Sequence, residues 1–174
     1  MIQKLTRRSF GMLLTGLALP LAARPAAAEG LAAPTGAVIL TVAGKITIFN
    51  VGETAQFDRP MLEALGMTSF KTKTPWYDNP VVFEGVRMDK LMTTVGAMGD
   101  TVTATALNDY TTELPVSDFA RYGTLMALKR DGEYMPVRDK GPLWIVYPYD
   151  SDPVLGRPPF TSRSAWQVRQ LVIK

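Results

Sequence analysis

The chain has 174 residues, of which 19 are Lys or Arg, 16 are Asp or Glu, and none is histidine or cysteine. Without imidazole or thiolate it lacks the usual ligands for zinc, copper or haem and cannot form a Ser-His-Asp or Cys-His nucleophile system, so only hard-ion sites with oxygen ligands remain open. Four basic residues and no acidic ones lie within residues 1–28, which leaves 15 basic against 16 acidic side chains, so the charge balance does not favour nucleic acid.

The first 28 residues have the composition of an export signal. Adjacent Arg7 and Arg8 precede an apolar run, Gly11–Ala23, and small residues up to Ala28 form a cleavage site of the A-x-A type. Paired arginines followed by an aromatic residue are typical of the twin-arginine route, although ordinary secretory signals also contain Arg-Arg. A membrane anchor is the alternative, but the run is shorter than the roughly 20 residues of a spanning helix, and Pro20 interrupts it.

We therefore expect the signal peptide, residues 1–28, to be removed near Ala28. The mature protein, residues 29–174, is then periplasmic and has no membrane anchor. Its length suits one domain with a hydrophobic core.

The first half of the mature chain predicts strands and two short helices. Two β runs, Val38–Val42 and Ile46–Phe49, flank a bend at Gly44. Asp58 has the pattern of an N-cap, with proline in the first turn of a helix that Gly66 ends. A second helix is expected in "RMDKLMTTVGAMG", ending at glycine, and the strict alternation of "TVTATAL" predicts a half-buried strand.

The second half predicts mainly strands. "TTELP" continues the β pattern, "VSDFARYG" suits a turn or two of helix, and "TLMALKRDGEYMPV" is typical of a hairpin around Asp131-Gly132. The apolar "PLWIVYP" favours a central strand buried on both faces. In the closing segment "AWQVRQLVIK" the alternation of apolar and polar residues changes phase, which a bulge near Arg169–Gln170 would explain. These elements together predict an α+β domain rich in β structure, with a multi-layer mixed sheet.

Three polar stretches are candidates for a binding site, and each has a plainer explanation. Asn108, Asp109 and Tyr110 follow a half-buried strand, where ligand groups are common, but Asn and Asp also form turns. Arg138 and Lys140 precede the apolar strand and could clamp an anion at the mouth of a pocket, or simply lie on the surface of the hairpin.

The stretch "SFKTKTPW" is the third candidate. Its lysines and interleaved hydroxyls, Thr72 and Thr74 among them, would suit a pyrophosphate. The same alternation also suits a solvated edge strand, in which lysines discourage aggregation.

Several segments, in one order, resemble the oxidoreductase molybdopterin-binding domain, the catalytic fold of sulfite oxidases and their bacterial relatives. These segments are "FEGVRMDKLMTTVGA", "ALNDYTTELPVSDF", "LMALKRDGEYM", "KGPLWIVYP" and "WQVRQLVI". The resemblance covers Gly36 to Lys174. It implies a mixed α+β fold of the sulfite oxidase type and molybdopterin as cofactor, acquired before export by the twin-arginine route.

The chain departs from this family at the metal ligand. Catalytic members have a molybdenum-binding cysteine in the region that corresponds to residues 67–86, whereas this chain has hydroxyl groups there, and Glu84 replaces a tryptophan. A hydroxyl is neither soft nor anionic at neutral pH. The residues expected at a retained cofactor or ligand site, with no metal ligand among them, are Thr72, Thr74, Asn108, Asp109, Tyr110, Arg138 and Lys140.

Two functions remain open from the sequence. One is a non-catalytic descendant that keeps the fold and binds a small-molecule ligand or a periplasmic protein partner. The alternative is a molybdopterin-dependent oxidoreductase with a non-cysteine metal environment, since the pterin supplies sulfur ligands of its own. A hydrolase has little support, because neither a nucleophile–base pair nor a paired-carboxylate motif stands out in the sequence.

Overall fold

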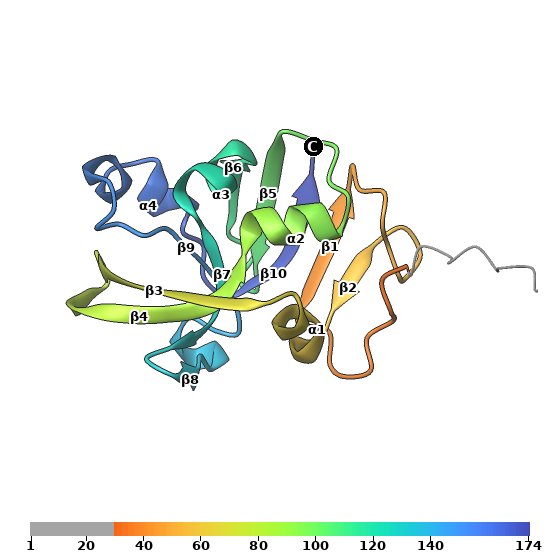
Figure 1. Cartoon of the computed structure of the whole chain (residues 1–174), viewed down its shortest axis with the longest axis horizontal. Helices are drawn as coiled ribbons and strands as arrows, with labels where there is room; N and C mark the ends of the chain where they lie inside the picture. Colours follow the sequence, from red (N-terminus) through yellow and green to blue (C-terminus); the bar gives the residue numbers. More distant parts are fainter. Residues whose placement is uncertain (1–29) are drawn as a thin grey trace, which may run out of the picture.

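A computed structural model describes residues 30–174, and Figure 1 shows its strands and short helices. The predicted leader and its cleavage site lie outside these residues. Within the described part, no helix has both the length and the apolar character needed to cross a membrane.

The first sheet has five strands in the order β2-β1-β10-β5-β6. Strand β10 is parallel to β1 and antiparallel to β5, so the end of the chain lies in the middle of this sheet. The register shifts between Val168 and Gln170, which confirms the predicted bulge. The bounds of the strands are Leu40–Gly44 (β1), Ala55–Phe57 (β2), Thr101–Ala106 (β5), Thr111–Pro115 (β6) and Val168–Ile173 (β10).

The second sheet has the order β3-β4-β7-β8, and β9 also pairs with β7. Strand β3 lies at the edge, as the lysine-containing alternation predicts. Strands β4 and β7 approach each other so closely at Gly85 that a Cβ there would overlap the carbonyl oxygen of Met126. The bounds are Met67–Thr74 (β3), Tyr77–Arg87 (β4), Leu125–Arg130 (β7), Glu133–Tyr134 (β8) and Trp144–Val146 (β9).

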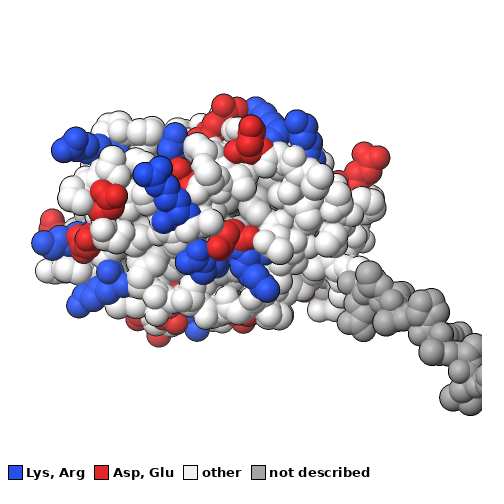
Figure 2. Space-filling model, turned by 45° about the horizontal axis from the view of Figure 1, so that its top comes forward, with Lys and Arg blue, Asp and Glu red and all other residues white. Residues whose placement is uncertain are grey.

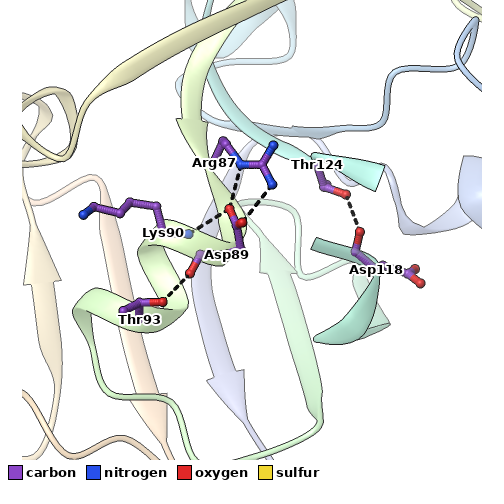
Figure 3. A network of polar contacts seen from close by, with 6 residues as sticks. All are labelled: Arg87, Asp89, Lys90, Thr93, Asp118 and Thr124. Atoms are coloured by element: carbon purple, nitrogen blue, oxygen red, sulfur yellow. Dashed lines mark hydrogen bonds and ion pairs between the residues drawn. The ribbon is translucent and has the colours of Figure 1, made fainter. Parts of the chain in front are cut away.

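Short helices connect the strands: α1 (Arg59–Ala64), α2 (Met88–Thr94), α3 (Ser117–Tyr122), α4 (Phe160–Arg163), and the 3-10 turns η1 (Val137–Asp139) and η2 (Pro153–Gly156). Asp58 caps α1, and the N–H groups of Met61, Gly36 and Thr35 lower the pKa of its carboxyl group. Figure 3 shows the start of α2, where Arg87 donates two hydrogen bonds to Asp89.

Two predicted strands differ from the structure. Ile46–Phe49 is not a strand, since only Ile46 forms an isolated bridge, with Ala97. The N–H groups of Thr47 and Ile48 instead donate to the carbonyl oxygen of Val95, just beyond α2. Strand β1 therefore ends at Gly44, which has a φ of +88°, and the last hydrogen bond to β10 comes from the N–H of Lys45 to the carbonyl oxygen of Ile173.

The predicted central strand in "PLWIVYP" is fully buried, but it is short and not central. Strand β9 has three residues and pairs in a ladder only with β7. On its other side, Trp144 forms a single bridge with Trp166, which connects the second sheet to the segment before β10. Prolines at both ends of the segment limit the strand because they lack the N–H donor.

One hydrophobic core includes residues of both sheets. Its largest fully buried side chains include Trp144, Tyr147, Phe57, Phe83 and Phe119. On the face drawn in Figure 2, Lys and Arg side chains are interspersed with Asp and Glu, and uncharged surface separates the groups.

Candidate functional site

A cavity of about 410 Å³ lies between the β5–β6 turn and the segment around α4. Two tryptophans, Trp76 and Trp166, form its aromatic part. Asn108 and the hydroxyl-bearing side chains of Tyr110, Thr161, Ser162 and Ser164 supply most of its polar lining. No charged side chain of the described residues lines it. A concave, uncharged cavity with aromatic and polar lining of this kind is typical of a small-molecule site.

The β5–β6 turn is both a hydrogen-bonded turn and one wall of this cavity. Asp109 has a φ of +63°, its N–H donates to Ala106, and the Asn108 side-chain oxygen accepts from the N–H of Tyr110 at 3.2 Å. Asn108 and Tyr110 face the cavity, whereas Asp109 does not line it and pairs with Arg169 at 2.7 Å. The two interpretations of this stretch are therefore compatible.

The opposite wall comes from α4 and the residues that follow it. The Tyr110 hydroxyl donates to the carbonyl oxygen of Ser162 at 3.0 Å and connects the two walls. Ser164 is only 2% exposed, and its hydroxyl contacts both the Tyr149 hydroxyl and, at 3.1 Å, the carbonyl oxygen of Phe160. Burial raises the pKa of Tyr149 to about 12, so its hydroxyl stays protonated at neutral pH.

All three tryptophans of the chain meet beside the cavity. The ring centre of Trp76 lies 5.3 Å from that of Trp144 and 5.7 Å from that of Trp166, in edge-to-face geometry. This cluster attaches the β3–β4 hairpin to β9 and to the segment before β10, which are far apart in the sequence. It also means that tryptophan emission reports on this region alone.

Lys140 adjoins the aromatic cluster. Its ammonium group lies 5.0, 5.8 and 5.7 Å from the ring centres of Tyr77, Trp144 and Trp166. The backbone explains this position, because Lys140 has a φ of +65° and its carbonyl oxygen accepts from Gln167, next to Trp166. The sequence grouped Lys140 with Arg138, but Arg138 is exposed on η1 and lines none of the cavities described here.

Thr72 and Thr74 stabilise the hairpin. The fully buried hydroxyl of Thr72 donates to the carbonyl oxygen of Lys73 and accepts from the N–H of Asp150 at 3.0 Å. The Asp150 carboxylate in turn accepts from the N–H of Lys73. The Thr74 hydroxyl accepts from the N–H of Trp76, so it orients a residue of the cavity without lining the cavity itself.

A buried ionic cluster supports the α4 wall. Asp118 is 7% exposed, and one of its carboxylate oxygens accepts from the Tyr147 hydroxyl at 3.0 Å and from Arg163 at 2.9 Å. Burial, and then the negative charge of Asp118, raise the pKa of Tyr147 well above its usual range. Figure 3 shows that the Thr124 hydroxyl also binds the backbone carbonyl of Asp118. Arg163 thus attaches the residues on either side of it, Ser162 and Ser164, to α3.

A second cavity, of about 390 Å³, lies near the start of α2, and its arginine is not free to bind a ligand. Its arginine, Arg87, is already bound by both carboxylate oxygens of Asp89 (Figure 3). A third, of about 380 Å³, is an apolar groove that includes the exposed side chains of Val38, Leu107 and Val137.

The residues present do not fit a molybdenum centre held by a protein ligand. The chain offers no thiol or imidazole, and within residues 30–174 no three acidic side chains are grouped to hold a metal ion. The Thr72 hydroxyl, in the segment where the resemblance predicts the cysteine of catalytic sulfite oxidases, uses both its proton and a lone pair within the protein. A metal bound there would have to break the contacts that attach β3 to Asp150.

The comparisons agree with an α+β domain of the sulfite oxidase type. The structure is similar to the sulfane dehydrogenase SoxCD from Paracoccus pantotrophus, with a TM-score of 0.58 and 14% sequence identity. The match covers 77% of this chain and 37% of that chain, so the protein spans little more than a third of its neighbour. No family model and no curated protein matches the sequence. The similarity confirms the predicted fold class and supports a fold like that of the molybdopterin oxidoreductases.

Sequence reasoning identified one wall of the cavity and missed the other. Asn108 and Tyr110 were candidates because they end a strand, whereas Thr161, Ser162 and Ser164 were not. The available signal was the Pro-rich segment before α4, which could be interpreted as a cover over a site or as a connection.

Proposed function

We propose that this chain is an exported, non-catalytic protein of the sulfite oxidase fold that binds a small molecule in the cavity beside Trp76 and Trp166. The observation that carries the proposal is the pairing of a neutral, aromatic and hydroxyl-lined cavity with a fully buried Thr72 hydroxyl, whose proton and one lone pair are bound within the protein. The first feature suits binding, and the second removes the natural counterpart of the metal ligand. Enzymatic redox chemistry is therefore not part of this proposal.

The test uses protein isolated from the periplasm of its native host. Native mass spectrometry is expected to detect a bound organic molecule, and metal analysis is expected to detect no stoichiometric molybdenum. Ser162→Phe, which fills the cavity from an exposed position, should release that molecule. The matched control is Ser151→Phe, since Ser151 is exposed and lines none of the three cavities.

The oxidoreductase alternative predicts the opposite result. Near-stoichiometric molybdenum, with sulfite or S-oxide turnover that Thr72→Ala or Thr74→Ala abolishes, would contradict the proposal. It would show that a hydroxyl group has replaced the cysteine.

Export is a separate part of the proposal and has its own test. Replacing Arg7 and Arg8 together by lysine should prevent export by the twin-arginine machinery, because that route requires the arginine pair. Cleavage near Ala28 should also cease. Unchanged appearance of the mature protein in the periplasm would contradict this route.

A periplasmic protein partner is the second candidate function, and the apolar groove favours it. Val137 is 53% exposed and lies in this groove with Val38 and Leu107. A photo-crosslinking side chain at Val137 should trap a partner in the native periplasm, whereas one at the exposed Glu133 should not. Equal labelling from both positions would remove the support for the groove.

A further inference from the structure

Ser164 presents a hydrogen-bond acceptor to the cavity. The Tyr149 hydroxyl has Ser164 as its only partner among the described residues, and the Ser164 hydroxyl also lies 3.1 Å from the carbonyl oxygen of Phe160. Both contacts are satisfied together only if Tyr149 donates to Ser164 and Ser164 donates to Phe160. The single Ser164 proton is then used, and one lone pair remains for a ligand.

The β5–β6 turn adds one more acceptor and one donor. The Tyr110 hydroxyl donates its proton to Ser162, so its oxygen can only accept from a ligand. The Asn108 oxygen accepts from the N–H of Tyr110, which fixes the amide orientation. The Asn108 NH₂ group has no partner within residues 30–174, and it is therefore a donor available to a ligand.

The cations near the cavity are already engaged. Arg163 pairs with Asp118 at 2.9 Å and Arg169 pairs with Asp109 at 2.7 Å. The Lys140 ammonium group lies beside three aromatic rings and 4.0 Å from the Asp139 carboxylate, and no Lys or Arg of the described chain lines the cavity. An anionic ligand would lose its hydration without gaining a free cation in return, so the cavity favours an uncharged one.

The aromatic walls favour a flat ligand. Trp76 and Trp166 both line the cavity, and indole faces bind planar π systems in stacked or edge-to-face geometry. A volume of about 410 Å³ is adequate for one or two fused rings.

We infer that the cavity selects an uncharged planar heterocycle that carries a lactam group, in which a ring N–H adjoins a C=O. The N–H is donated to the Ser164 oxygen, and the carbonyl accepts from the Asn108 amide. This inference rests on the proposed ligand-binding function and adds the chemical class of the ligand.

Hypoxanthine and its 1-methyl derivative are suitable probes, because they differ in the lactam N–H. Calorimetric titration of the full mature protein should show hypoxanthine binding at least about tenfold more tightly than 1-methylhypoxanthine, since methylation removes the N–H donor and places a methyl group against the Ser164 oxygen. Urate, which is anionic at neutral pH, should bind more weakly than hypoxanthine. These comparisons need no variant.

Two serine variants then localise the selectivity. Ser164→Ala should remove most of the tenfold difference between the two probes, whereas Ser151→Ala should preserve it, because Ser151 is exposed and lines none of the three cavities. Equal binding of the probes, a preference for urate, or no binding of any probe at millimolar concentration would overturn the inference. In those cases a different molecule found bound to the periplasmic protein would leave the proposed function intact, and an empty protein would overturn both.

Discussion

Removal of the Asp118 carboxylate should destabilise the protein more than any change to its surface ion pairs. In Asp118→Ala, Arg163 loses its charge partner and the fully buried Tyr147 loses the acceptor for its hydroxyl. Both remaining groups are poorly hydrated, because the Arg163 side chain is only 20% exposed. The variant therefore leaves a charge and a donor unsatisfied at the same time.

The expected magnitude follows from the separate contacts. Breaking a buried ion pair costs about 3 kcal/mol or more, whereas an exposed pair is worth about 0–1 kcal/mol. Tyr147→Phe removes one hydrogen bond and keeps the Asp118–Arg163 pair, so it should cost about 1.5 kcal/mol. For a domain of this size, a loss of about 3 kcal/mol lowers Tm by roughly 10 °C.

Urea unfolding followed by tryptophan emission measures these differences. The control is Glu113→Ala, which breaks the exposed pair with Lys174 and should change the free energy of unfolding by less than about 0.5 kcal/mol. The slope with urea should be the same in all variants. If Asp118→Ala lost no more stability than Glu113→Ala, the claim that this cluster attaches α4 to α3 would be wrong.

Three further predictions concern the surroundings of the site. Thr72→Val should lower the free energy of unfolding by about 1–2 kcal/mol, measured in urea, since the N–H of Asp150 loses its acceptor. The pKa of Tyr149 is raised to about 12 in the folded protein, whereas an unfolded tyrosine has a pKa of about 10. The protonated Tyr149 therefore contributes its full stability below about pH 10, and this contribution is lost as the pH rises towards 12. Tyr149→Phe should flatten the alkaline limb of the curve of stability against pH. Gly141→Ala should prevent accumulation of folded protein, judged by circular dichroism, because the new Cβ would overlap the carbonyl oxygen of Met135.

The sequence predicted well those features that depend on neighbouring residues. The Asp58 cap, the alternation of β5 and the turn at Asp131-Gly132 follow from local backbone chemistry, and the structure contains all three. The bulge in β10 was visible because it changes the phase of the hydrophobic pattern.

The failures are cases in which a distant partner determines the outcome. Ile46–Phe49 has the composition of a strand, but the carbonyl oxygen of Val95 competes for its N–H groups. Similarly, Ser164 directly follows α4 and is more than 50 residues from Tyr110, and no local pattern indicates that the two line one cavity. The hydrophobic period of a segment and the strand or helix propensities of its residues contain no information on contacts with residues so far away in the sequence.

Arg138 and Lys140 show how such contacts determine chemistry as well as shape. In the sequence they are two positively charged residues, two positions apart, and either could hold an anion. The structure gives them different surroundings, since Arg138 is exposed to water. Lys140 lies beside rings that come from β4, β9 and the segment before β10, and 4.0 Å from the Asp139 carboxylate. A lysine held against aromatic faces contributes to packing and is less available to a ligand. No charged side chain of the described residues lines the adjoining cavity, and a neutral cavity between two indoles suits an uncharged ring better than a phosphate.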